Sequence, residues 1–195
     1  PVHASVQLFS NSSRALFGLR FLRWEFVFAF ISGSIIGGLA AAGISRNINL
    51  EYTPLIIAAY ILLTVWGPKP EFRKPLKGEF VLIGAVQTGL SMMVGATGPM
   101  GQAALLRKGL QRDALVVTAA MMMTFTHLIK IVLFALLGFA FISYWQIIIG
   151  MSAAVILGAL LGTHIRYKIP EALFHRILKW ALTVLALRMI YITLS

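Results

Sequence analysis

A glycine- and proline-rich break interrupts one long apolar stretch of the chain. Gly95-Ala96-Thr97-Gly98-Pro99-Met100-Gly101-Gln102 lies inside residues 80–106, which are otherwise largely apolar. Glycine and proline disfavour helix, and non-helical backbone survives in lipid only when it is buried in protein or lines a wet cavity. Pro99 can begin a short helix over residues 99–106, whose free N–H groups and positive dipole end favour a small anion. We therefore predict an anion-binding cradle here, with a simple packing kink as the alternative, and assign to it Gly95, Thr97, Gly98, Pro99 and Gln102.

Two ionisable side chains lie inside another apolar stretch, residues 114–141. His127 and Lys130 are three residues apart, so a helix places them on one face. Lys130 is about eleven residues, or roughly 16 Å, from the outer end of the stretch, too deep to reach the interface fully. Because no Asp or Glu lies deep in an apolar stretch, we predict that Lys130 is the counter-charge of an anionic substrate and that His127 gates or hydrogen-bonds it. A structural lysine and a packing histidine are the alternatives.

Uncharged polar side chains would complete this site. Gln7, Ser10 and Asn11 recur at helical spacing and are followed by Arg14, so we expect the stripe to face a polar interior as the opposite wall. Such groups more often link helices by hydrogen bonds than bind a ligand. Of the further polar candidates we assign Ser91 to the substrate site; the others are Gln87, Thr88, Thr118, Thr124 and Thr126.

The composition indicates that the elements carrying these residues lie in lipid. Of the 195 residues, 59% are hydrophobic and 12% charged, whereas soluble domains have about 45–50% apolar and about 25% charged residues. This excludes a soluble enzyme. The sequence has no cysteine for thiolate zinc sites, and no HExxH, GxSxG or GxxxxGK(S/T) for an intramembrane enzyme or a nucleotide-driven pump. We predict no enzyme activity, no metal site and no cofactor.

Five apolar stretches can each cross the hydrocarbon, which takes roughly 20 residues. They are residues 26–44, 50–66, 114–141, 145–165 and 178–194. If residues 80–106 enter and return, every strongly basic loop falls on one side, which is cytoplasmic by the positive-inside rule. We therefore predict an all-α polytopic membrane protein with about five full transmembrane helices and a broken, re-entrant helical hairpin over residues 80–106.

The net charge of +11 follows from this topology. The basic loops predicted to be cytoplasmic, in a protein of the cell (inner) membrane, are residues 14–23, 68–78, 107–112 and 166–179. Because these charges are spread over four places, they form no coherent patch for nucleic acid. The predicted partners are a small anionic substrate and the lipid bilayer, and a homo-oligomer is compatible with the sequence.

A weak internal repeat relates the two halves of the chain. Aligning Trp24 with Trp145 puts Gly37 on Gly158, with opposite orientations in the membrane. Inverted repeats of this kind are typical of secondary transporters. The predicted division is residues 1–67 as the remainder of a first repeat truncated at its N-terminus, 68–78 as a cytoplasmic basic loop, and 79–195 as a second repeat with the hairpin and three spans.

Two pairs of glycines are spaced four residues apart in apolar stretches. They are Gly33 with Gly37 and Gly158 with Gly162. Small residues at this spacing let helix backbones approach closely in membranes. We expect both pairs to pack against a neighbouring helix.

Four segments resemble those of a known family. They are Gly95-Ala96-Thr97-Gly98-Pro99-Met100, Leu105-Leu106-Arg107-Lys108-Gly109-Leu110, Val117-Thr118-Ala119 and Thr126-His127-Leu128-Ile129-Lys130. Together they look like the second conserved half of the sulfite exporter TauE/SafE family of membrane permeases, and residues 1–14 are similar to the segment after the family's first glycine-rich motif. By this resemblance the first motif would precede Pro1, so we expect the chain to lack the N-terminal part that carries it.

The resemblance implies a multi-pass permease for a small sulfur-containing anion, such as sulfite or a sulfonate. The residues independently favour an anion through a half-helix N-terminus, a deep lysine and no buried carboxylate. We predict export or import of such an anion by alternating access. The alternatives are a non-transporting membrane scaffold or assembly subunit and a permease for another small ion.

Overall fold

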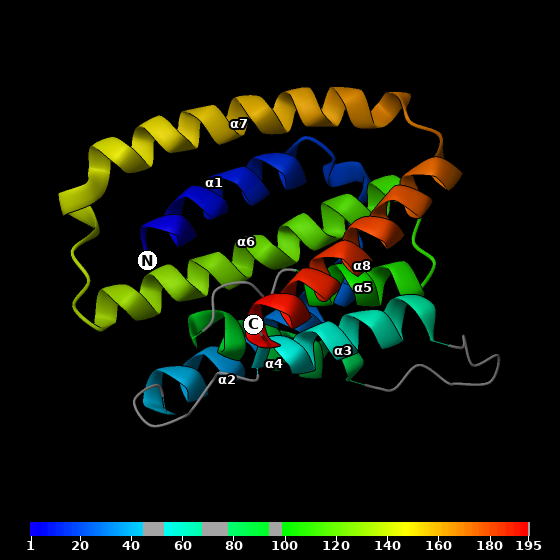
Figure 1. The fold of residues 1–195 in the computed structure, drawn as a ribbon. Helices are drawn as coiled ribbons and strands as arrows, with labels where there is room; N and C mark the ends of the chain where they lie inside the picture. The colour runs from blue at the N-terminus through cyan, green and yellow to red at the C-terminus, as the bar shows by residue number, and fades with distance from the viewer. Residues whose placement is uncertain (45–52, 68–77, 94–98, 195) are drawn as a thin grey trace.

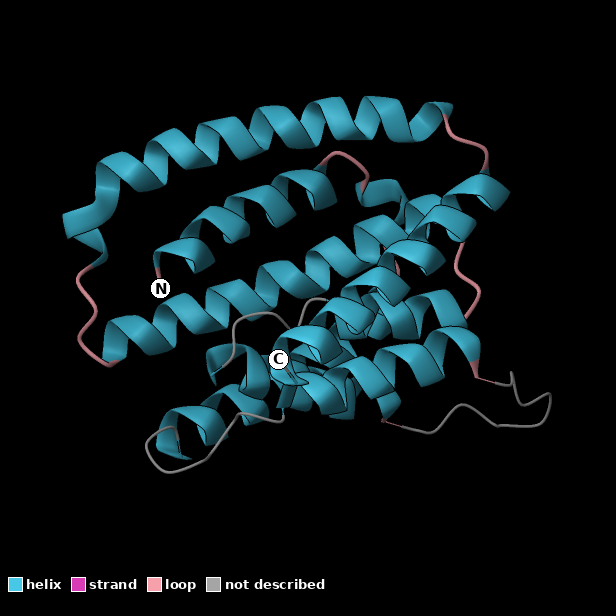
Figure 2. Ribbon diagram, in the orientation of Figure 1, coloured by secondary structure: helices cyan, strands magenta, loops and turns pink. Residues whose placement is uncertain are grey.

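The regular elements of the described residues are all helices, which confirms the predicted fold class. The computed structural model describes residues 1–44, 53–67, 78–93 and 99–194 (Figures 1 and 2). The α-helices are α1 (Val2–Leu16), α2 (Trp24–Ile44), α3 (Thr53–Trp66), α4 (Glu79–Met93), α5 (Pro99–Arg107), α6 (Arg112–Leu136), α7 (Trp145–Lys168) and α8 (Glu171–Leu194). Two short 3-10 helices, η1 (Leu19–Phe21) and η2 (Phe141–Tyr144), precede α2 and α7.

Four helical segments in the described ranges are long and apolar enough to cross a membrane. They cover Trp24–Gly43, Arg112–Leu136, Phe141–Lys168 and Glu171–Leu194. Each contains most of a predicted span. The fifth predicted span, residues 50–66, corresponds to α3, whose 14 residues fall short of the roughly 20 that a perpendicular crossing takes.

The most C-terminal basic segment was predicted as a loop over residues 166–179 and is mostly helical. Arg166 belongs to the last turn of α7, and α8 begins at Glu171, so Arg176 and Lys179 lie in its early turns. The loop prediction was wrong because it ended each predicted span where the apolar stretch ends. Helices continue past the apolar region to where lysine and arginine side chains reach headgroups and water.

The stretch that contains the break forms two helices. α4 ends at Met93, and α5 begins at Pro99, the residue predicted to start a new helix. The N-terminal end of α4 meets the C-terminal end of α5, because Lys108 Nζ lies 2.6 Å from Glu79 Oε2. Glu79 begins α4 and Lys108 follows α5, so the two helices form a hairpin. That this hairpin enters and leaves the membrane on one side stays a prediction.

The two glycine pairs have different surroundings. α2 packs along α4, and a Cβ on Gly33 or Gly37 would lie 1.8 or 1.9 Å from a carbonyl oxygen of α4. The prediction of close packing is confirmed for this pair. Around Gly158 and Gly162 in α7, no heavy atom of the described residues would lie within 4 Å of an added Cβ. The prediction was wrong there, because small residues permit a close approach but do not supply the neighbouring helix.

The position of α5 depends on two clusters of buried apolar side chains. One cluster joins α2, α4, α5 and α6 and includes Phe30 and Leu105. The other joins α3, α5 and α8 and includes Ile57, Met100 and Leu182. α1 lies between α6 and α7 and contacts both (Figure 1). These contacts bring the N-terminal turn of α5 opposite the polar side of α1.

Candidate functional site

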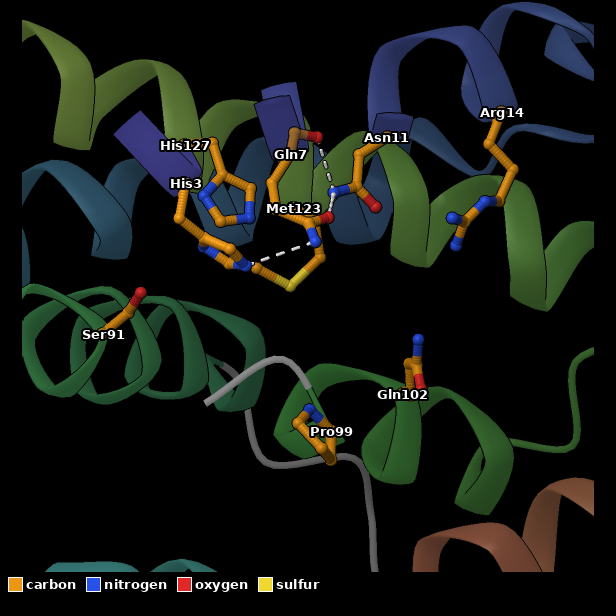
Figure 3. A pocket seen from close by; sticks show the side chains of 9 residues that line it. All are labelled: His3, Gln7, Asn11, Arg14, Ser91, Pro99, Gln102, Met123 and His127. Atoms are coloured by element: carbon orange, nitrogen blue, oxygen red, sulfur yellow. Dashed lines mark hydrogen bonds between the residues drawn. The ribbon is translucent and has the colours of Figure 1, made fainter. Parts of the chain in front are cut away.

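A cavity of about 260 Å³ lies where α1, α4, α5 and α6 meet. Side chains of α1 and α6 face those of α4 and α5 across it (Figure 3). The residues that line it are His3, Gln7, Asn11, Arg14, Ser91, Pro99, Gln102, Met123 and His127. Seven of these were predicted as site residues from the sequence: Gln7, Asn11, Arg14, Ser91, Pro99, Gln102 and His127. Four helices from both halves of the chain therefore converge on one small space.

The wall from α1 is the polar stripe identified in the sequence. His3, Gln7, Asn11 and Arg14 follow at intervals of four, four and three residues, so they share a helix face. Asn11 Nδ2 donates to the Gln7 carbonyl oxygen at 2.8 Å and to Gln7 Oε1 at 3.3 Å. Arg14 Nη2 donates to Ser10 Oγ at 3.3 Å. Ser10 itself does not line this cavity but lines a second one, because it lies a little farther round the helix.

Two histidine rings lie near one another at the cavity. The ring centroids of His3 and His127 are 6.3 Å apart in an edge-on arrangement. His127 is buried, and its Nδ1 has no hydrogen-bond partner among the described residues. Such a buried ring nitrogen can serve a ligand as donor or acceptor. Neither His3 nor Met123 was predicted as a site residue. His3 lies one helical turn before Gln7, and Met123 lies one turn before His127, so helical spacing from these two predicted residues could have found them.

The first turn of α5 forms the facing wall through Pro99 and Gln102. We expected its free N–H groups to point at a ligand, but the Gly101 N–H donates to Gln87 Oε1 at 2.7 Å. The expectation was wrong for this group, because a side-chain amide of α4 takes one of the donors that a helix start leaves unpaired. The remaining predicted cradle residues lie outside the described residues: Gly95, Thr97 and Gly98.

Several other polar candidates form contacts within the protein. Thr88 Oγ1 lies 3.4 Å from Thr126 Oγ1, which joins α4 to α6. Thr118 Oγ1 accepts the backbone N–H of Arg23 at 3.2 Å, and Thr124 donates to a carbonyl of its own helix. The contacts of Thr88 with Thr126 and of Thr118 with Arg23 match the alternative that such groups link separate segments of the bundle.

Lys130 is buried beside the end of α4 and does not itself line the cavity. Lys130 is only 5% exposed. Its Nζ donates to the Ser91 carbonyl oxygen at 2.6 Å and to Ser91 Oγ at 2.9 Å. The last carbonyl groups of a helix lack partners within it and carry partial negative charge, so an ammonium there is stabilising. Lys130 therefore completes the C-terminal turn of α4 and contacts the cavity only through Ser91.

The described walls of the cavity are positively charged. Arg14 contributes a guanidinium, and Lys130 lies behind the lining residue Ser91. None of the described lining residues is Asp or Glu. No group of three or more His, Cys, Asp or Glu side chains among the described residues is arranged to hold a metal ion. Guanidinium, amide and imidazole groups around a small space form an arrangement that can bind an oxyanion.

One protein family matches the part of the chain that forms the cavity. The family described as "Sulfite exporter TauE/SafE" matches residues 1–189. No curated protein and no solved structure matches the chain. The matched residues include every described residue that lines the cavity.

Proposed function

Because the chain belongs to the sulfite exporter TauE/SafE family of membrane transporters, we propose that it carries a small sulfur-containing oxyanion, such as sulfite or a sulfonate, through the cavity between α1, α4, α5 and α6. The observation that carries this proposal is a polar cavity with a guanidinium and no carboxylate on its described walls.

Arg14 and the amides of the cavity would hold the anion. A guanidinium can donate two parallel N–H bonds to an oxyanion, and such charge-assisted bonds are stronger than neutral ones. Gln102 adds a side-chain amide from the opposite wall, and His127 adds a ring nitrogen that has no other described partner. A liquid water molecule takes about 30 Å³, so 260 Å³ accommodates a small oxyanion with a few waters.

Lys130 would act on the anion through Ser91. Ser91 Oγ accepts from the ammonium at 2.9 Å, so its own O–H hydrogen is left to donate into the cavity. The positive charge behind Ser91 strengthens that donor and raises the electrostatic potential at the cavity. In this proposal Lys130 is a positioning residue, whereas the anion contacts Ser91.

Alternating access would involve the hairpin of α4 and α5. The Glu79–Lys108 ion pair and the Gln87–Gly101 hydrogen bond join these two helices at separate levels. A hairpin joined in this way can tilt against α1 and α6 as one unit and open the cavity to one side at a time. We place the protein in the cell membrane with its basic segments in the cytoplasm, following the positive-inside rule.

Flux measured in proteoliposomes tests this function. We expect sulfite flux in the native chain and, in Arg14→Gln, a loss of about 10- to 100-fold, because a charge-assisted hydrogen bond contributes about 1.5–3 kcal/mol. Arg20→Gln removes the same charge from an exposed residue outside the cavity and should leave flux unchanged. Parallel runs with an alkyl sulfonate, thiosulfate and chloride define the substrate. Equal flux in Arg14→Gln, Arg20→Gln and the native protein would contradict the assigned cavity, and no flux of any anion above empty liposomes would favour the scaffold.

A further inference from the structure

A second cavity, of about 680 Å³, lies beside the first and contains two arginines. It is bounded by α1, α6, α7 and the start of α8, and its polar side chains are Ser10, Arg14, Thr163 and Arg166. Arg14 lines both cavities. The remaining lining is apolar or glycine, so the polar groups gather near the cytoplasmic end predicted for α7.

Arg166 is a buried cation with an unused donor. The residue is 6% exposed, its Nε lies 3.1 Å from Asp113 Oδ1, and its Nη2 is buried with no hydrogen-bond partner among the described residues. Thr163 Oγ1, also in the cavity wall, is likewise buried without a described partner. Buried polar groups are nearly always paired in folded proteins, so these two atoms beside the cavity point to a ligand for it.

The charges around Arg166 favour an anion. Asp113 is shared, because Arg112 Nη2 lies 3.0 Å from Asp113 Oδ2 while Arg166 pairs with the other oxygen. Glu171 accepts the backbone N–H of Arg112 at 3.1 Å. Arg14 and Arg166 line the cavity, whereas neither Asp113 nor Glu171 is among its described lining residues, so the charge on the cavity side is positive.

The rest of the cavity follows a stripe of small residues along α7. Ala154, Gly158, Gly162 and Arg166 are each four residues apart and share one helix face. Both glycines have open space where a side chain would be. From Arg166 to Ala154 the groove runs about 18 Å at the helical rise, and α7 is the most exposed of the candidate spans, with 11% of its apolar window buried.

We propose that this cavity binds an anionic phospholipid, with the phosphate on Arg166, Arg14 and Thr163 and one acyl chain along the groove at Gly162 and Gly158. A free oxyanion would use the arginines alone and would not account for the apolar groove that continues from them. A phospholipid accounts for both parts, because its charged phosphate would lie at the arginines while its acyl chain would lie along the stripe of small residues. The proposal requires the chain to lie in a bilayer but not that it transports anything.

Lipid retention by the purified full chain tests the proposal. Delipidated protein in detergent is incubated with phosphatidylglycerol or phosphatidylcholine of identical acyl chains, and bound lipid is counted by native mass spectrometry. We expect one retained phosphatidylglycerol, and about tenfold less retention in Arg166→Gln, which loses charge-assisted hydrogen bonds. Gly158→Leu fills the groove, keeps every charge and should show a similar loss. The matched controls are Arg188→Gln, at an exposed arginine of α8, and Gly43→Leu, at a glycine of α2 that also has open space.

Three outcomes would overturn the lipid site. Equal retention of phosphatidylcholine would show that the arginines do not select the headgroup. Native retention in Gly158→Leu would show that the groove holds no chain, and this variant decides the matter if Arg166→Gln does not fold. Inorganic phosphate that stabilises the native chain and Gly158→Leu alike, while phosphatidylglycerol stabilises neither, would identify a site for a free oxyanion instead.

Discussion

Replacing Lys130 by methionine removes the ammonium that pairs with the end of α4. Methionine is close in length and is tolerated in apolar surroundings, so the substitution mainly deletes charge and hydrogen-bond donors. It leaves the Ser91 carbonyl, which accepts from Nζ at 2.6 Å, without that partner in a buried place. The variant therefore separates the contribution of the charge from that of the packing.

The expected loss is larger than that of an ordinary hydrogen bond. A hydrogen bond to a charged group contributes about 1.5–3 kcal/mol net, and an unsatisfied buried acceptor costs about 1–3 kcal/mol. The lost hydrogen bond and the unsatisfied carbonyl are partly the same effect, so their energies do not add in full. We expect Lys130→Met to lower the free energy of unfolding by about 2–4 kcal/mol. Ser91→Ala removes only the hydroxyl and should cost about 1 kcal/mol. The double variant should cost less than the sum, since both changes delete the same Nζ–Oγ contact.

The assay is reversible unfolding, in mild detergent, of the native protein, the two single variants and the double variant, together with sulfite flux in liposomes. Lys168→Met serves as the control, because this lysine is exposed at the end of α7 and has no such contact with α4. We expect it to stay within about 0.5 kcal/mol of the native protein. Flux through Lys130→Met should fall even at temperatures where the variant is fully folded.

Two results would refute this reasoning. Lys130→Met that unfolds like Lys168→Met would show that the end of α4 does not need the ammonium. Strictly additive losses in Lys130→Met and Ser91→Ala would show that their hydrogen bond contributes nothing. Normal flux through a destabilised Lys130→Met would leave the structural contribution standing and exclude the positioning role.

Three further predictions concern the hairpin and its neighbours. Gly37→Ala should lower the free energy of unfolding by about 1–3 kcal/mol, because its Cβ would meet the α4 backbone at 1.9 Å, whereas Gly43→Ala, in open space, should be neutral or slightly stabilising; thermal unfolding distinguishes the two. Gln87→Leu should cost about 1–3 kcal/mol, because it uncaps the first turn of α5, and faster hydrogen exchange of that turn is the measurement. Single cysteines in residues 68–77 and at Arg107 should react with a membrane-impermeant maleimide from the same side, since the chain has no native cysteine; labelling from opposite sides would contradict the predicted orientation of the hairpin.

Helical periodicity made much of the site predictable. Gln7, Asn11 and Arg14 share a helix face whatever the rest of the fold, so their spacing predicted one wall. Pro99 and the glycines before it predicted where a helix starts, because proline tolerates the first turn and disfavours the interior. Both inferences use local backbone geometry, which does not depend on distant parts of the chain.

Long-range partners could not be read from the same patterns. Lys130 was predicted to face a substrate, but its partner is a main-chain carbonyl of Ser91, and every residue has such a carbonyl. Gly33 and Gly158 belong to the same motif and differ only in which helix lies opposite, which depends on the packing of the whole bundle. The boundary of α8 was missed because a charged turn of helix and a charged loop have the same composition.

The nine-residue helix α5 has mechanical consequences for the cavity. A helix this short is marginal by itself, so its orientation is imposed by what it touches. Its neighbouring residues Ala103 and Ala104 belong to different packing clusters, one shared with α3 and α8 and the other with α2, α4 and α6. A displacement of either set of helices must therefore rotate α5 and move Gln102 relative to Arg14. The width of the cavity therefore depends on how the two parts of the bundle are aligned. If the cavity binds the anion as proposed, we expect strain applied far from it to change the affinity for that anion.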